Sequence, residues 1–131
     1  MTMNVHIQHL AERLRHNAEF RLAKQKEVPS DLRNTEAATE SERLAAAIDT
    51  GEVNSGLARV YAAFCEDERT MHHTMDVERE LVSGIGFHSS FDKPNALLSA
   101  IIEGAHRVYR DEVEFAELTP EDEASVRGEA E

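Results

Sequence analysis

The sequence predicts an all-α fold, a single-domain bundle of four main helices followed by a short acidic C-terminal helix. Three observations support this fold class. Apolar residues recur at steps of three and four along most of the chain, which is the spacing of one helix face. Residues that cap or stop helices separate these segments. No stretch alternates apolar and polar residues between turn signals, so no strand is predicted.

The composition is that of one domain with an aliphatic core. A chain of 131 residues most often folds as one unit, and 40% of these residues are hydrophobic although none is Trp. The single cysteine excludes an internal disulfide. The sequence shows neither a signal-peptide pattern nor an apolar run of about 18 residues, so we expect a soluble, cytoplasmic protein.

The first predicted helix covers residues 3–26 and carries two stripes. The apolar stripe is expected to face the core and contains Met3, Ile7, Leu10, Leu14, Ala18 and Leu22. A second, partly apolar stripe lies on the opposite side and contains Val5, His9, His16 and Phe20. Such a helix can contact both its own core and a partner subunit, which suggests a homodimer through this helix. The alternative is a single core face with scattered surface residues.

The second helix is predicted over residues 35–49. Pro29 ends the helix before it, and Asn34 or Thr35 can cap the new one. Gly51 is a helix stop. The residues expected to face inward recur at the helical spacing and are Ala37, Ser41, Leu44 and Ile48.

Residues 54–83 form the longest helical pattern, which begins with Asn54 or Ser55 as its cap. Its apolar stripe is expected to be the centre of the core and contains Leu57, Val60, Tyr61, Phe64, Met71, Met75 and Val82. Thr70 and Thr74 lower the helix propensity locally. A kink or break near residues 67–70 is therefore compatible with the pattern.

The fourth helix begins with Asp92 as its cap and Pro94 in its first turn. Its core stripe is the clearest in the sequence and contains Leu98, Ile101, Ile102, Ala105, Val108 and Tyr109. Thr119 and the acidic residues after it start a last, short helix. The predicted organisation is a helical bundle domain over residues 1–118, then a short acidic helix and a disordered tail over 119–131.

Charge is distributed unevenly along the chain. The net charge is −12, and residues 111–131 hold nine acidic residues and one arginine, a net of −8. Residues 1–33 carry a net of +2. Direct binding to a nucleic-acid backbone requires a basic surface, so the composition disfavours this class of function.

The acidic end is the predicted partner-binding surface. If the fourth helix continues through Leu118, carboxylates on one face lie about 5–6 Å apart, which is of the same order as the spacing of phosphates along a nucleic-acid strand. The residues assigned to this surface are Glu103, Asp111, Glu114, Glu117, Glu121, Asp122 and Glu123. The hypothesis is a non-enzymatic regulator or inhibitor, from a host or viral system, that binds a basic surface of a protein partner as a nucleic-acid mimic. The alternative is that the acidic end only keeps the protein soluble.

A competing hypothesis is a helical metal-binding protein with zinc or iron as its cofactor. Cys65, Glu68 and His72 follow one another at helical spacing, and His106 occupies a similar flank of the fourth helix. If the two helices are neighbours, these side chains could provide the sulfur, oxygen and nitrogen ligands of a zinc-like site. No Cys-x-x-Cys or His-Glu-x-x-His motif supports this site, and a small core cysteine is the simpler interpretation. Without the site, no cofactor is expected.

No catalytic motif is intact, so we do not expect an enzyme. Gly84-Ile85-Gly86 follows a predicted helix rather than a strand, which argues against a phosphate-binding loop. Cys65 with His72 or His73 lacks the flanking pattern of a cysteine nucleophile. A further alternative is a structural assembly subunit, for which the second stripe of the first helix is the only indication.

Overall fold

The computed structural model of the chain describes residues 4–109, with side chains up to His106. No strand occurs in this range, where Ile85 and Ser89 form an isolated bridge, so the all-α class is confirmed there. The predicted helix after Thr119 and the predicted domain boundary at residue 118 lie outside the described residues. The helices are α1 (Val5–Glu27), α2 (Arg33–Asp49), α3 (Ser55–Glu66), α4 (Met71–Ser83) and α5 (Pro94–Tyr109).

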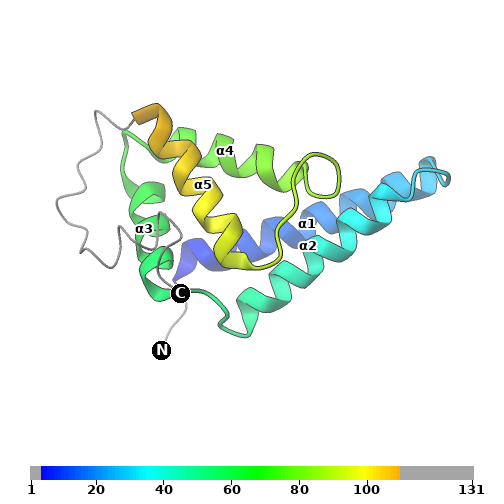
Figure 1. Cartoon of the computed structure of the whole chain (residues 1–131), viewed down its shortest axis with the longest axis horizontal. Helices are drawn as coiled ribbons and strands as arrows, with labels where there is room; N and C mark the ends of the chain where they lie inside the picture. The colour runs from blue at the N-terminus through cyan, green and yellow to red at the C-terminus, as the bar shows by residue number, and fades with distance from the viewer. Residues whose placement is uncertain (1–3, 110–131) are drawn as a thin grey trace.

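Helices α1 and α2 form a long antiparallel hairpin, against which the other three helices pack (Figure 1). Helix α3 lies at the end where α1 begins, α4 lies along the hairpin, and α5 starts beside the hairpin and runs obliquely away from it. The turn between α1 and α2 projects beyond α4 and α5. No helix in the described part of the chain has the length and apolar character that a membrane crossing requires.

The hairpin packs closely because many of its buried residues are small. Asn17 and Ser41 are buried between the helices, where the Asn17 amide donates a 3.0 Å hydrogen bond to the Ser41 hydroxyl. Gly51 ends α2 with φ +80°, which confirms the predicted stop. The buried alanines are Ala11 and Ala18 on α1 and Ala37, Ala38 and Ala45 on α2.

Helix α2 begins two residues earlier than predicted, at Arg33. The predicted caps Asn34 and Thr35 are inside the helix, so this prediction is wrong. The Asp31 carboxylate instead accepts a hydrogen bond of 3.2 Å from the Arg33 backbone N–H. A side chain just before the helix therefore satisfies one of its first free donors.

The core is largely aliphatic, as predicted. All four inward residues predicted for α2 are buried, and so are Ile7, Leu10, Leu14 and Ala18 of α1. Leu22 is 42% exposed, in contrast to its prediction, because it lies on the projecting part of the hairpin. Met3 lies outside the described residues. The largest fully buried side chains include Leu10, Leu14, Leu44, Ile48, Val60, Tyr61, Ile85, Leu97, Leu98, Ile101 and Ile102.

The predicted helix over residues 54–83 is two helices, α3 and α4, which are separated by residues 67–70. Asn54 caps α3, and its side chain accepts a 3.0 Å hydrogen bond from the Leu57 N–H. At the break, the Thr70 hydroxyl donates a 2.7 Å hydrogen bond to the Phe64 carbonyl at the end of α3. The break near residues 67–70 therefore has a local cause, because a side chain binds a carbonyl that a continuing helix would use.

Helix α4 does not continue the apolar stripe of α3. Met75 was expected in the core but is 50% exposed, whereas Thr74 and Glu78 are buried. The predicted stripe assumed one uninterrupted helix, and the break changes the face that the second half turns to the core. Leu57, Val60, Tyr61, Phe64 and Val82 are buried as predicted.

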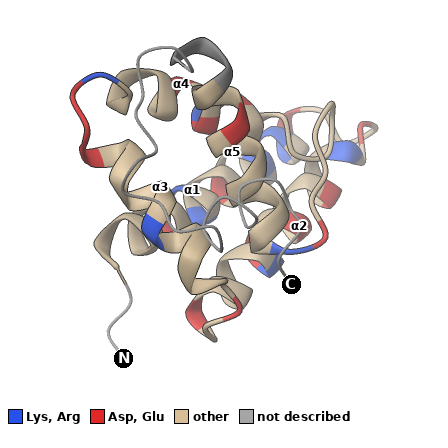
Figure 2. Ribbon diagram, turned by 60° about the vertical axis from the view of Figure 1, so that its left-hand side comes forward, with Lys and Arg blue, Asp and Glu red and all other residues tan. Residues whose placement is uncertain are grey.

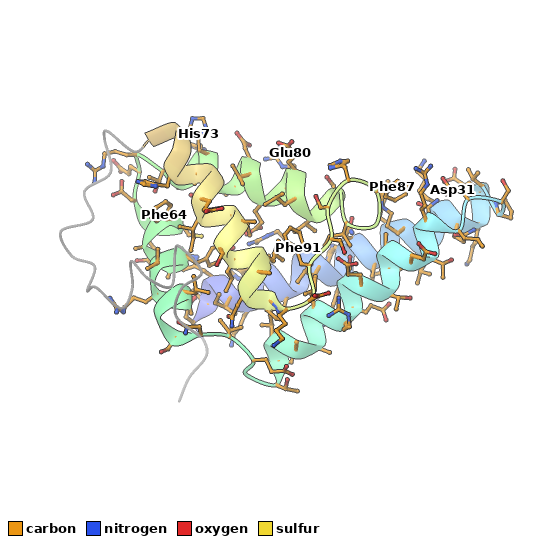
Figure 3. All side chains as sticks on the ribbon, viewed as in Figure 1. Asp31, Phe64, His73, Glu80, Phe87 and Phe91 are labelled. Carbon is orange, nitrogen blue, oxygen red and sulfur yellow. The ribbon has the colours of Figure 1, made fainter. Side chains whose placement is uncertain are left out.

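The segment that connects α4 to α5 lies against α2. Gly86 has φ +84°, and a Cβ atom at this position would lie 2.7 Å from the Ala37 Cβ. The Arg43 guanidinium donates to the carbonyl of Phe91 at 2.8 Å and also to that of Asp92. Figure 3 shows Phe91 beside the hairpin. Helix α5 then begins at Pro94, which lies in its first turn as predicted, although Lys93 rather than Asp92 directly precedes the helix.

Candidate functional site

The predicted partner-binding surface is described only where it begins. Glu103 is exposed on α5, the helix that leads into the acidic segment. Figure 2 shows acidic residues on α5 and in the segment that follows α3. The other six residues assigned to this surface lie outside the described residues: Asp111, Glu114, Glu117, Glu121, Asp122 and Glu123.

Most basic side chains in the described part of the chain are used in internal contacts. Arg33 pairs with Asp31 at 2.8 Å, and Arg15 pairs with Asp49. Lys24, Arg69 and Arg79 pair with nearby carboxylates in the same way. The described range also exposes carboxylates for which the structure shows no ion pair, and these include Glu12, Glu19, Glu36, Glu42, Glu68, Glu80 and Glu103. Exposed carboxylates without an ion pair are therefore common on the described part of the surface.

A buried polar cluster connects three helices. Glu78 of α4 is 4% exposed and accepts hydrogen bonds from the Arg13 guanidinium of α1 and the Tyr61 hydroxyl of α3. Arg13 also donates to the Tyr61 oxygen at 3.2 Å. A carboxylate buried at this depth requires such partners, because it has lost nearly all of its water.

The cluster changes the acidity of its members. Burial and the neighbouring Glu78 charge raise the pKa of Tyr61, which keeps its hydroxyl protonated as a donor. Burial alone would lower the pKa of Arg13, but the hydrogen bond and charge of Glu78 raise it overall. The arrangement fits an ion pair between Arg13 and Glu78 with a neutral tyrosine beside it.

A cleft of about 510 Å³ lies between α1 and α4 over this cluster. Its lining includes Glu78 and Arg13 and also His9 and His16, which belong to the second stripe predicted for the first helix. The exposed Met75 is on the opposite wall. A second hollow, of about 820 Å³, lies between the start of α1, the end of α2 and α3. Neither holds a set of groups that indicates a reaction.

Cys65 is a half-buried thiol on α3. Burial raises the pKa of the Cys65 thiol to about 11. A hydrogen bond with Tyr61 acts in the opposite direction but has the smaller effect. The thiolate is the form that attacks a substrate or binds a metal, so this environment opposes both roles.

The four predicted metal ligands come from different parts of the structure. Cys65 is on α3, His72 is exposed on α4 and His106 is half-buried on α5. Glu68 is exposed in the turn between α3 and α4, so the expectation that it shares one helix face with Cys65 and His72 is wrong. Within residues 4–109, no group of three or more His, Cys, Asp or Glu side chains has an arrangement that could hold a metal ion. Elemental analysis of the purified, untagged protein tests the metal hypothesis directly.

Sequence reasoning missed Glu78 as a structural centre. The signal was present, since Glu78 is four residues from both Thr74 and Val82 and shares their buried face. A carboxylate on a core face predicts a buried partner, and Arg13 was available on the first helix.

Comparison of the chain with protein-family models, with curated proteins and with solved structures gives no match.

Proposed function

We propose that the protein is a non-enzymatic interaction protein that binds a basic surface of a protein partner and so regulates or inhibits that partner. A nucleic-acid-binding protein is the partner class that fits best, because its basic groove can accept a row of carboxylates in place of phosphates. The observation that carries the proposal is the net charge of −8 over residues 111–131, within a chain of net charge −12.

The described residues support this proposal in two ways. Arg13, Arg15 and Arg33 are held in internal ion pairs, which makes them poor contacts for an acidic partner. Helix α5 carries the exposed Glu103 and leads directly into the acidic segment, so an acidic surface can extend from the helix into that segment. Complementary charge mainly speeds association and selects the partner.

Charge reversal of the acidic segment tests the proposal. The variant E114K/E117K/E121K should capture much less of a basic partner than the wild-type protein in a pull-down from cognate lysate at low salt. The loss is expected because the three changes reduce the net charge of residues 111–131 from −8 to −2 and place a repulsive charge at three positions of the proposed contact.

A matched control separates this contact from a general effect of net charge. The variant E19K/E42K/E80K changes the net charge equally, and its three sites are exposed on α1, α2 and α4. It should retain capture. Equal losses in the two variants, or unchanged capture by E114K/E117K/E121K at low salt, would contradict the proposal.

A further inference from the structure

The projecting end of the α1–α2 hairpin is an exposed, apolar and basic surface. We call residues 20–33 the hairpin tip. Among the described residues, six large hydrophobic side chains are notably exposed, and four of them are in the tip: Phe20 (51%), Leu22 (42%), Val28 (46%) and Leu32 (65%). The tip also carries four basic and two acidic residues, a net of +2 in a strongly acidic chain. Such a concentration of apolar surface indicates a contact with another protein segment.

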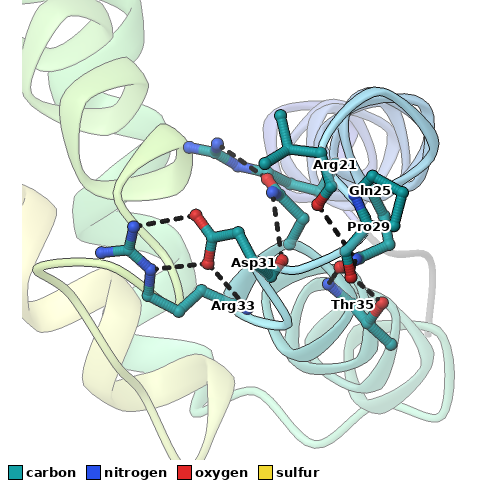
Figure 4. A network of polar contacts seen from close by, with 8 residues as sticks. Arg21, Gln25, Pro29, Asp31, Arg33 and Thr35 are labelled. Atoms are coloured by element: carbon teal, nitrogen blue, oxygen red, sulfur yellow. Dashed lines mark hydrogen bonds and ion pairs between the residues drawn. The ribbon is translucent and has the colours of Figure 1, made fainter.

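Hydrogen bonds hold the hairpin tip in one conformation (Figure 4). The Gln25 amide donates to the carbonyls of Val28 and Pro29 at 3.4 and 3.0 Å, and its oxygen accepts from Thr35 of α2. Asp31 binds the Arg33 guanidinium through two hydrogen bonds of 2.8 Å. A surface that is already ordered loses little conformational entropy when it binds a partner.

The segment after α4 anchors the hairpin tip to the body of the protein. The guanidinium groups of Arg21 and Arg33 lie 4.1 and 4.7 Å from the centroid of the Phe87 ring. Arg21 also donates to the Ser83 carbonyl at the end of α4. Figure 3 shows Phe87 beside this end of the hairpin. These contacts occupy Arg21 and Arg33, while Lys26 is exposed. Lys24 has an exposed pair with Glu27 and lies 5.7 Å from the centroid of the exposed Phe20 ring.

The chain itself contains a segment whose chemistry matches the tip. Residues 111–118 read Asp-Glu-Val-Glu-Phe-Ala-Glu-Leu, with four acidic residues among three large apolar ones. The apolar residues can cover the exposed side chains of the tip, and the carboxylates can pair with Lys24 and Lys26.

Residues 111–118 follow α5 so closely that they cannot reach the tip of their own chain. Helix α5 ends at the opposite end of the molecule from the tip (Figure 1). Glu114, near the middle of the segment, is five residues beyond Tyr109, a reach of at most about 18 Å. Along α1, Lys24 is 19 residues beyond Val5, a distance of about 28 Å. A second copy of the chain has no such restriction.

We infer that the hairpin tip binds residues 111–118 of a second copy of this chain, and that the resulting self-association covers the acidic segment. The inference rests on the proposed function, because the same segment binds the basic partner. Self-association and partner capture therefore compete, and the partner should dissociate the self-associated form.

Sedimentation equilibrium of the full chain, at about 50 and 500 mM salt, tests the inference. The wild-type protein should self-associate at low salt and less at high salt. K24E/K26E should weaken self-association at least about tenfold, and so should E114K/E117K. L32S, at an exposed site that should not affect folding, should weaken it too. K93E/R79E changes the net charge as K24E/K26E does, but away from the tip, and should have a much smaller effect.

A mixture of the two charge-reversed variants gives the sharpest result. Each variant alone should be mostly monomeric. Equal amounts of K24E/K26E and E114K/E117K should associate with each other, because the unchanged tip of one then meets the unchanged segment of the other with the wild-type charges on both sides. A monomeric wild-type protein at low salt, or a mixture without association, would overturn the inference. K24E/K26E keeps the acidic segment, so its capture of a basic partner reports on the proposed function separately.

Discussion

The carboxylate of Glu78 is held by donors from two other helices, Arg13 of α1 and Tyr61 of α3. At the scale of the residue, this contact explains more of the structure than any site predicted from the sequence. A buried charge is stable only with its partners in place, so Glu78 fixes how α1, α3 and α4 lie relative to one another. Its role is structural, since all three groups bind one another.

Loss of Arg13 should therefore destabilise the fold strongly. R13A leaves the Glu78 charge buried without its cation, which we expect to lower the free energy of unfolding by about 3 kcal/mol near pH 7. R15A is the control on the same helix, since Arg15 and Asp49 form an exposed pair, and should cost less than about 1 kcal/mol. Urea unfolding measures both. Similar values for the two variants would contradict the structural role of Glu78.

Cys65 should react slowly as a thiol. Its pKa of about 11 means that the thiolate fraction at pH 8 should be about a hundredfold lower than for an ordinary cysteine. The rate of alkylation of the folded protein, measured against pH, should still rise above pH 10. Unfolding in urea should restore ordinary reactivity. A rate that levels off near pH 9 in the folded protein would show that burial does not control this thiol.

At the scale of the element, the break between α3 and α4 lies where the threonines allowed one, and the departure from the prediction is the apolar stripe, which does not continue across it. Apolar spacing predicted one helix over residues 54–83, because Phe64, Met71 and Met75 continue the stripe of Leu57. The side chains of Asp67, Arg69 and Thr70 bind local groups instead, and such local contacts are not visible in a periodicity. The helix ends at Asn54, Gly51 and Pro94 were predictable, since capping and stopping residues act locally.

The contact between Asp67 and Arg69 can be followed through a pKa. Hydrogen bonds from the Arg69 side chain and backbone lower the pKa of Asp67 to about 2. The folded carboxylate is thus favoured, and its small stabilising contribution should be complete above about pH 4 and lost as the pH falls towards 2. NMR titration of the Asp67 side chain should give this midpoint, and R69A should raise it towards the ordinary value. An unchanged midpoint in R69A would contradict the contact.

At the scale of the whole molecule, composition and apolar spacing predicted the all-α class and most of the core. They did not predict that Glu68 lies in a turn, because the apolar pattern treated this segment as helix. The spacing of Glu78 from Thr74 and Val82 was a readable signal of its burial, but the sequence did not show which partner it binds, since the register between α1 and α4 depends on packing. The charge layout, in contrast, was readable directly and remains the basis of the proposed function.

The salt dependence of partner binding tests the central claim most directly. The affinity of the purified partner for the full chain should fall steeply between about 50 and 500 mM salt, because opposite charges form the contact. E114K/E117K/E121K should bind weakly at both concentrations, whereas E19K/E42K/E80K should follow the wild-type curve. An affinity that does not change with salt, or that is the same for wild type and E114K/E117K/E121K, would contradict an acidic partner-binding surface.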